Sequence, residues 1–142
     1  NNFLAGRAAL RRSILRMESH LTVPSILPNR HGAPILPLDV KGSISHKDGL
    51  AVGLALSNFS GTVGVDIEQF ASSSGSTLPI SRILTMHERN NIGELNGMFV
   101  SVEEVLLRFS LKEALFKAVH PVVERFIGMR DVEIDPHNDG TA

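Results

Sequence analysis

The part of the sequence that most limits the possible folds is the long helix predicted from Ser101 to His120. Ser101 and Glu104 form a capping-box pattern that predicts its start, and Pro121 predicts its end. Its apolar side chains fall on two opposite sides, with Val102, Leu106, Phe109 and Phe116 on one and Leu107, Leu111, Ala114, Leu115 and Ala118 on the other. A helix that is apolar nearly all round is buried on several sides. The rest of the chain is therefore expected to pack around it.

The other predicted elements mix neighbouring strands with separate helices. A helix is expected from Phe3 to Met17, where apolar residues recur at helical spacing. The remaining predictions are strands at Gly42–His46, Gly49–Leu56, Thr62–Glu68 and Met129–Ile134, a helical piece within Leu78–Asn91 started by Thr85 with Glu88 three residues on, and a flexible Ser/Gly-rich loop at Ala71–Thr77. This mixture indicates an α+β fold.

Length and composition limit the classes of function. The 142 residues suit one domain, and 42% hydrophobic residues supply a core. The net charge of −1 gives no case for a nucleic-acid partner. No apolar run reaches the ~20 residues of a membrane span, no signal peptide opens the chain, and a cytoplasmic location is expected. The absence of Cys excludes disulfides, thiolate zinc sites and cysteine catalysis.

The charges are unevenly spread along the chain. Residues 1–48 carry seven Lys/Arg and three Asp/Glu, a balance of +4, whereas the remainder carries seven Lys/Arg and twelve Asp/Glu, a balance of −5. A basic half beside an acidic half suits an anion bridged by a metal ion. Ordinary surface variation gives the same pattern, so the charge distribution alone does not distinguish an anion-binding site from an ordinary surface.

The predicted strand Thr62–Glu68 brings two carboxylates together. Because side chains alternate along a strand, Gly64, Asp66 and Glu68 share one face while the apolar residues between them face the core. Two carboxylates on one face repel each other unless they are solvated or hold a hard cation such as Mg²⁺. Both interpretations stay open for this segment.

The long helix carries a carboxylate on an apolar face. Glu113 lies at the centre of one apolar stripe, and Lys117 follows it at the i,i+4 spacing of a favourable ion pair. The pair is therefore either structural or part of a functional site. In the basic half, Ser45 and His46 end a predicted strand, and Arg7 lies in the first helix. His and Arg bind anions, although either can also be an ordinary structural or solvated residue.

Taken together, these segments resemble the 4'-phosphopantetheinyl transferase family. Val63-Gly64-Val65-Asp66-Ile67-Glu68 is similar to its V-G-[IV]-D-[IV]-E motif. Phe109-Ser110-Leu111-Lys112-Glu113-Ala114-Leu115-Phe116-Lys117 matches its [FW]-[ST]-x-K-E-[AS]-x-x-K motif. Gly42-Ser43-Ile44-Ser45-His46 matches its strand ending in S-H, and Phe3-Leu4-Ala5-Gly6-Arg7 resembles the enterobactin-synthase and surfactin type.

The resemblance implies an activity and roles for the matched residues. It implies Mg²⁺-dependent transfer of phosphopantetheine from coenzyme A to a serine of an acyl or peptidyl carrier protein, as in siderophore, polyketide or fatty acid biosynthesis, with release of 3',5'-ADP. The implied roles are metal ligation by Asp66, Glu68 and Glu113, catalysis by Glu113 and Lys117, and coenzyme A binding by Arg7, Ser45, His46, Lys112 and Lys117.

The resemblance also implies an organisation and leaves alternatives. It implies one transferase domain over 1–142, with an antiparallel sheet packed with helices, a coenzyme A side at 1–61 and an acidic metal-binding half at 62–142. We expect a fragment, incomplete at both ends. Ala33 stands where many relatives carry a basic residue, which Arg30 or His31 would have to replace. A catalytically inactive coenzyme A-binding relative and a different Mg²⁺-dependent enzyme such as a small nuclease remain the alternatives.

Overall fold

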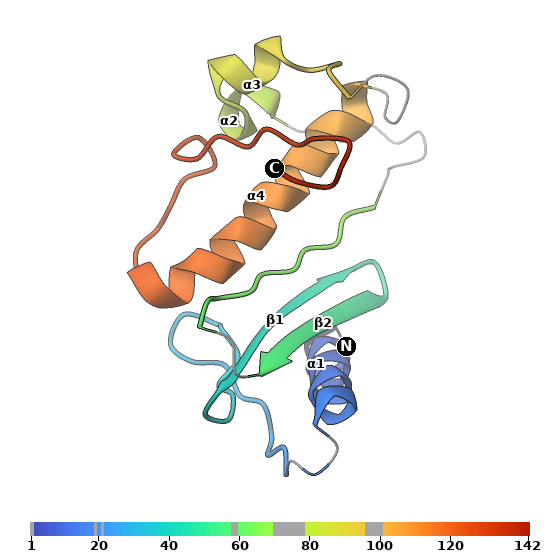
Figure 1. Ribbon diagram of the computed structural model, residues 1–142, viewed down its shortest axis with the longest axis vertical. Helices are drawn as coiled ribbons and strands as arrows, with labels where there is room; N and C mark the ends of the chain where they lie inside the picture. The colour runs from blue at the N-terminus through green and yellow to red at the C-terminus, as the bar shows by residue number, and fades with distance from the viewer. Residues whose placement is uncertain (1, 19, 21, 58–59, 70–78, 96–100) are drawn as a thin grey trace.

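The computed structural model of the chain describes residues 2–18, 20, 22–57, 60–69, 79–95 and 101–142. Along the chain it forms helix α1 (Asn2–Met17), strands β1 (Val40–Lys47) and β2 (Leu50–Ser57), short helices α2 (Ile80–Ile83) and α3 (Met86–Asn90), and helix α4 (Ser101–Val123). Figure 1 shows the hairpin and α1 in one part of the molecule and the three later helices in the other. This is the α+β fold expected from the sequence. In the part of the chain described, no helix is long and apolar enough to cross a membrane.

The hairpin β1–β2 is antiparallel, with Val40 opposite Ser57 and Lys47 opposite Leu50. Asp48 and Gly49 make its turn with positive φ angles of 44° and 86°, as a tight two-residue hairpin requires. Helix α1 packs on one face of the hairpin, and Leu10 and Ile14 of α1 are fully buried there. The first helix and the first two strands are therefore confirmed within one to two residues at their ends.

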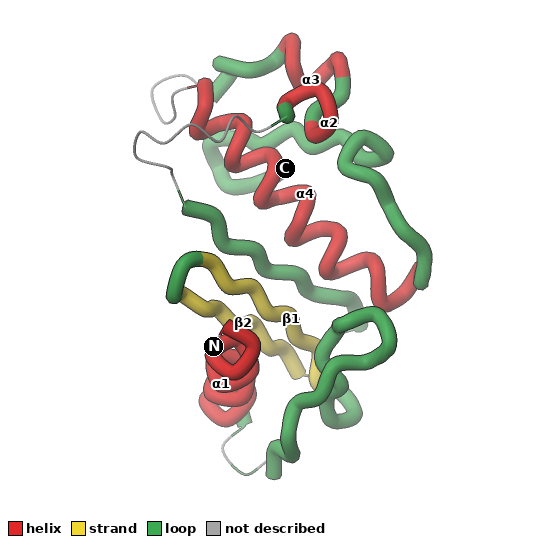
Figure 2. The backbone as a smooth tube through the Cα atoms, turned by 180° about the vertical axis from the view of Figure 1, so that it is seen from behind, coloured by secondary structure: helices red, strands yellow, loops and turns green. Residues whose placement is uncertain are grey.

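Helix α4 lies on the other side of the hairpin, with an extended segment of the chain between them (Figure 2). Helices α2 and α3 pack near its N-terminal part, where Ile83, Leu84 and Val105 form a second small core. The predicted start of α3 is confirmed: Thr85 accepts a hydrogen bond from the Glu88 backbone, and the Glu88 side chain accepts one from the Thr85 backbone.

Two predicted strands are not part of the observed sheet, which has two strands within the described residues. Residues 62–68 are extended and follow β1, but the backbone N–H of Val65 donates to the Ser43 hydroxyl instead of to a β1 carbonyl. Residues 129–134 are also irregular, because Lys112 binds the carbonyls of Met129 and Val132. Side chains thus take the hydrogen bonds that a strand partner would take.

The long helix begins at Ser101 as predicted, but the role of Glu104 and the C-terminal end differ from the prediction. The Glu104 carboxylate accepts hydrogen bonds from the Gly93 backbone and from Arg108 rather than closing a capping box. Pro121 does not stop the helix, which continues to Val123. The predicted loop 71–77 lies outside the described residues.

Candidate functional site

The carboxylate of Asp66 is the centre of the polar site. Its Oδ1 accepts hydrogen bonds from Lys117 Nζ at 2.6 Å and Ser45 Oγ at 2.8 Å, and its Oδ2 accepts one from Ser110 Oγ at 2.9 Å. The Asp66 side chain is only 5% exposed. Asp66 therefore joins β1, the extended segment and α4 at one point.

The alternation of β1 explains why its serines reach this point. Ser43 and Ser45 are buried, and Lys47, two residues further on, forms an ion pair with Glu68 at 2.8 Å. These side chains follow each other at the two-residue period of a strand, so they line the edge along which residues 62–68 run in the same direction. Each carboxylate of the acidic segment thus has a partner on β1.

A glycine allows the acidic segment to approach α4. A Cβ atom built on Gly64 would overlap the carbonyl oxygen of Ala114 and lie 2.8 Å from the backbone nitrogen of Ala118. No side chain fits between these backbones, so Gly64 is needed for the close approach. This contact brings Asp66 within reach of α4.

The pKa values of two carboxyl groups differ because their surroundings differ. Burial alone would raise the pKa of Asp66, but the hydrogen bonds from Lys117 and Ser45 and the charge of Lys117 outweigh it, so that the pKa lies below its ordinary value. Burial raises the pKa of Glu113; the charge of Lys117 opposes this effect, and the negative charges of Asp66 and Glu68 add to it. Asp66 is thus held as a carboxylate, whereas Glu113 has an increased affinity for a proton.

The helical ion pair considered from the sequence does not form. Lys117 bonds to Asp66 and Ser45 at 2.6 and 3.0 Å, and in the described part of the chain it has no ion pair with Glu113. The functional interpretation of Glu113 and Lys117 therefore stays open on the geometry.

A cavity of about 910 Å³ adjoins this site. Its lining includes Asp66, Glu68 and Lys117 from the acidic half together with Arg7 and His46 from the basic half. Arg7 stacks on the Phe3 ring at 3.5 Å from its centroid and donates Nε to the Ile26 carbonyl at 2.9 Å. Predicted residues of the acidic half and of the basic half thus lie along the same hollow, whereas Glu113 is not part of its lining.

The region around Ala33 also contributes to this cavity. His31 lines it, and its ring contacts His120 of α4 edge-on, with centroids 5.2 Å apart. Arg30 bonds to His31 at 2.8 Å and to Glu124 at 2.8 Å. Of the two suggested replacements for a basic residue at Ala33, His31 therefore lies at the cavity, while Arg30 is paired with a carboxylate.

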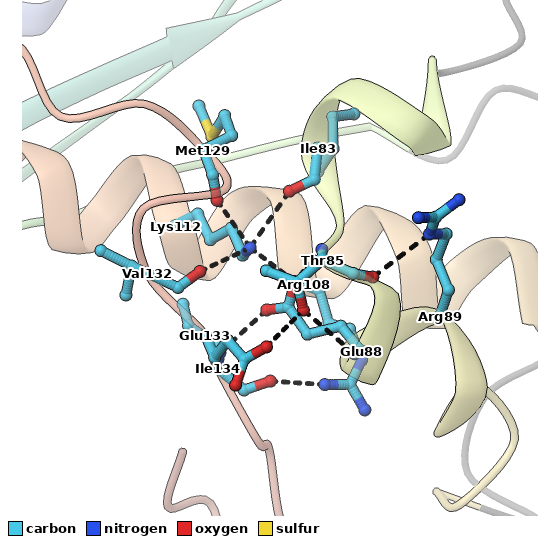
Figure 3. Close-up of polar contacts among 10 residues, drawn as sticks. All are labelled: Ile83, Thr85, Glu88, Arg89, Arg108, Lys112, Met129, Val132, Glu133 and Ile134. Carbon is cyan, nitrogen blue, oxygen red and sulfur yellow. Dashed lines mark hydrogen bonds and ion pairs between the residues drawn. The ribbon is translucent and has the colours of Figure 1, made fainter.

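Lys112 lies outside this cavity, on another side of α4. Its side chain is 2% exposed, and its Nζ bonds to Glu88 at 2.6 Å and to three backbone carbonyls on the side of α4 that faces the C-terminal segment (Figure 3). The lining of the 910 Å³ cavity does not include it. Its position does not support the expected contact with coenzyme A, because all the N–H groups of its ammonium are already used.

The acidic residues suit a hard cation in their chemistry. Asp66, Glu68 and Glu113 offer carboxylate oxygens, the donors that Mg²⁺ prefers. Burial is the main cause of the raised pKa of Glu113, and the repulsion by Asp66 and Glu68 that adds to it is of the kind that a cation relieves. In the structure, Asp66 is paired with Lys117 and Glu68 with Lys47. The described residues contain no group of three Asp, Glu or His side chains gathered around one point for a metal. The donor types fit, and ligation by all three requires side-chain movement.

Two residues of the site were missed by sequence reasoning. Ser110 is seven residues before Lys117 and hence on the same side of the helix, a spacing that predicts a shared partner. Lys47 is two residues after Ser45 and hence on the same side of β1. Helical and strand periods, applied from the residues already singled out, would have found both.

Comparison with known families gives two matches. A family model described as 4'-phosphopantetheinyl transferase superfamily matches residues 62–142, more than half of the chain. A second, described as 4'-phosphopantetheinyl transferase N-terminal domain, matches residues 1–56. A search of curated proteins finds no match.

Proposed function

This chain belongs to the 4'-phosphopantetheinyl transferase superfamily, and from this premise we propose that it moves phosphopantetheine from coenzyme A to a serine of an acyl or peptidyl carrier protein with the help of Mg²⁺. The proposed products are the modified carrier protein and 3',5'-ADP. The pathway of the carrier is left open among siderophore, polyketide and fatty acid biosynthesis.

The observation that carries this proposal is the position of Asp66. Its carboxylate is bonded to Lys117 and Ser45, and all three border a 910 Å³ cavity whose lining also includes Arg7 and His46. A carboxylate–lysine centre beside basic groups suits a phosphate ester, because phosphoryl transfer needs positioning and neutralisation of charge more than covalent chemistry.

The proposed roles follow from this arrangement. Arg7 and His46 bind phosphate groups of the coenzyme, and Lys117 faces the pyrophosphate that is cleaved. Glu113 takes the proton of the attacking serine hydroxyl, for which its raised pKa is favourable. Asp66, Glu68 and Glu113 would hold Mg²⁺, which when bound neutralises charge on the phosphates.

The alternative is a relative that binds coenzyme A without transferring its arm. The observation that favours it is the lack, among the described residues, of three acidic or histidine side chains already gathered for a metal. Against it stand the bond of Lys117 to Asp66 and the raised pKa of Glu113, which the burial of Glu113 and the charges of Asp66 and Glu68 produce, since a binding role alone does not require a proton acceptor.

Mass spectrometry separates the two functions. An apo carrier protein is incubated with the chain, coenzyme A and Mg²⁺, with parallel samples lacking the chain or containing excess chelator. We expect a phosphopantetheine mass gain only in the complete mixture. Calorimetric binding of coenzyme A without a mass gain would leave the binding relative as the function, and a gain in excess chelator would remove the metal from the proposal.

A further inference from the structure

The ammonium of Lys112 is enclosed by acceptors from three separate parts of the chain (Figure 3). Nζ donates to Glu88 Oε2 at 2.6 Å, to the Met129 and Val132 carbonyls at 2.7 and 2.9 Å, and to the Ile83 carbonyl at 3.1 Å. An ammonium has three N–H groups, so four acceptors saturate it. Lys112 with these four residues is called the Lys112 network below.

Glu88 is the only carboxylate in this network and is equally enclosed. Its side chain is 1% exposed; Oε2 also accepts the backbone N–H of Thr85, and Oε1 accepts that of Ile134, both at 2.8 Å. Glu88 does not line the 910 Å³ cavity. The network therefore holds α4 to α3 and the C-terminal segment without touching the site.

The network lies on the side of α4 opposite the site. Lys112 and Lys117 are five residues apart, which at 100° per residue separates them by about 140° around the helix. A side-chain end lies about 6 Å from the helix axis, so a rotation of about 20° moves it by about 2 Å. Such a movement would break the 2.6 Å contact between Lys117 and Asp66.

We propose that Lys112 is a positioning residue, whose network sets the rotation of α4 and thereby the positions of Glu113 and Lys117 relative to Asp66. The expected change in kcat rests on the proposed function, whereas the expected change in the position of α4 does not. It gives the lysine of the helix motif a role through its neighbours instead of through the coenzyme.

The kinetic test compares Lys112→Met with Glu88→Gln. The second variant removes the negative charge that pairs with Lys112, and Glu88 lies outside the cavity. At a temperature well below the unfolding midpoint of each variant, we expect both to lower kcat by about tenfold or more, and the Kd for coenzyme A to change by the same factor in both. The double variant should be no worse than the single ones, because both act through one contact. Arg130→Gln removes an exposed cation beside Met129 and serves as the matched control.

A second readout does not depend on activity. Because the chain has no Cys, spin labels can be attached at Leu50→Cys and Val102→Cys, which replace exposed side chains on the hairpin and on α4. Electron–electron resonance then gives the distribution of distances between the labels. We expect Lys112→Met and Glu88→Gln to shift or broaden it, and Arg130→Gln to leave it unchanged.

Two results would overturn the inference. A tenfold weaker Kd for coenzyme A in Lys112→Met but not in Glu88→Gln would make Lys112 a coenzyme ligand. Folded variants of both residues with normal kcat and normal label distances would make the network a source of stability only. If the unchanged chain transfers nothing, the proposed function fails, and the label distances still decide whether Lys112 positions α4.

Discussion

Replacing Gly64 by Ala should separate the acidic segment from α4. The added methyl group would overlap the carbonyl oxygen of Ala114 and lie 2.8 Å from the Ala114 carbonyl carbon and the Ala118 nitrogen. Ordinary contacts begin at 3.4 Å, so the two contacts at 2.8 Å alone require the backbones to move apart by about 0.6 Å, and the overlap with the carbonyl oxygen requires more. Both obstructing groups are helical backbone and cannot turn aside. The movement would carry Asp66 away from Lys117.

The size of the effect follows from this movement. Overpacking a well-packed contact costs about 1–3 kcal/mol of unfolding free energy, which for a chain of this size lowers Tm by about 3–10 °C. A misplacement near 1 Å costs about a hundredfold in rate. We therefore expect Gly64→Ala to remain folded at 20 °C and to lose about a hundredfold in kcat, measured by the mass gain of the carrier protein.

Gly53→Ala is the matched control for this experiment. A Cβ on Gly53 would overlap the backbone of Leu10 and lie 2.7 Å from the carbonyl carbon of Ala9, where α1 crosses β2. It should cost similar stability and alter coenzyme A affinity through Arg7, while kcat at saturating coenzyme A stays within about threefold of normal. A folded Gly64→Ala variant with normal kcat would refute the argument that the backbone contact sets the geometry of the site.

Three further predictions address individual side chains. Glu113→Gln should remain folded and lose about a hundredfold or more in carrier modification, since an amide cannot accept the serine proton; near-normal turnover by mass spectrometry would make Glu113 structural. Arg7→Ala and His46→Ala should each weaken coenzyme A binding about tenfold by calorimetry, as expected for loss of a charge-assisted contact, and unchanged affinity in both would remove this wall from the coenzyme site. The unfolding free energy of the metal-free chain should fall as the pH drops through the folded-state pKa values of Asp66 and Glu88, which lie below their ordinary 3.8 and 4.5, because the unfolded chain binds more protons there. Asp66→Asn should flatten this decrease in acid unfolding curves, and an unchanged slope would contradict the assigned pKa direction.

Local patterns were sufficient for much of the fold. Helix α1, the hairpin and the Thr85 cap were predictable because each depends on residues close in sequence: helical spacing, a turn at Asp48-Gly49 and a hydroxyl three residues before Glu88. The extended segment 62–68 was predicted as a strand with Asp66 and Glu68 on one face, and both carboxylates do meet partners on β1. However, its Val65 N–H binds the Ser43 hydroxyl, and the segment is not part of the sheet. Alternation shows which side chains share a face, and it does not show whether a backbone or a serine hydroxyl accepts the neighbouring N–H.

The candidate site was predictable as a set of residues and not as a set of contacts. Motif order brought Asp66, Lys117 and Ser45 into one hypothesis, and the structure bonds these three to one another. The side of α4 on which Lys112 acts was not predictable, because the helix is apolar on opposite sides and both predict burial. Only the tertiary partners, Glu88 among them, distinguish the two sides.

Lys112 and Lys117, the two lysines of the helix motif, differ in the number of hydrogen-bond acceptors that surround them, and this difference separates a structural role from a chemical one. The Lys112 ammonium has four acceptors and a side chain that is 2% exposed, so it has no N–H left for a ligand. The Lys117 ammonium has two acceptors in the described part of the chain, Asp66 and Ser45, and its side chain is 27% exposed at the cavity. One N–H of Lys117 is thus available, and a phosphate oxygen is the acceptor that would make the strongest bond with it. Of the two lysines, Lys117 is therefore the one that can bind a phosphate group of the proposed coenzyme directly, and its position relative to Asp66 is what we propose that Lys112 sets.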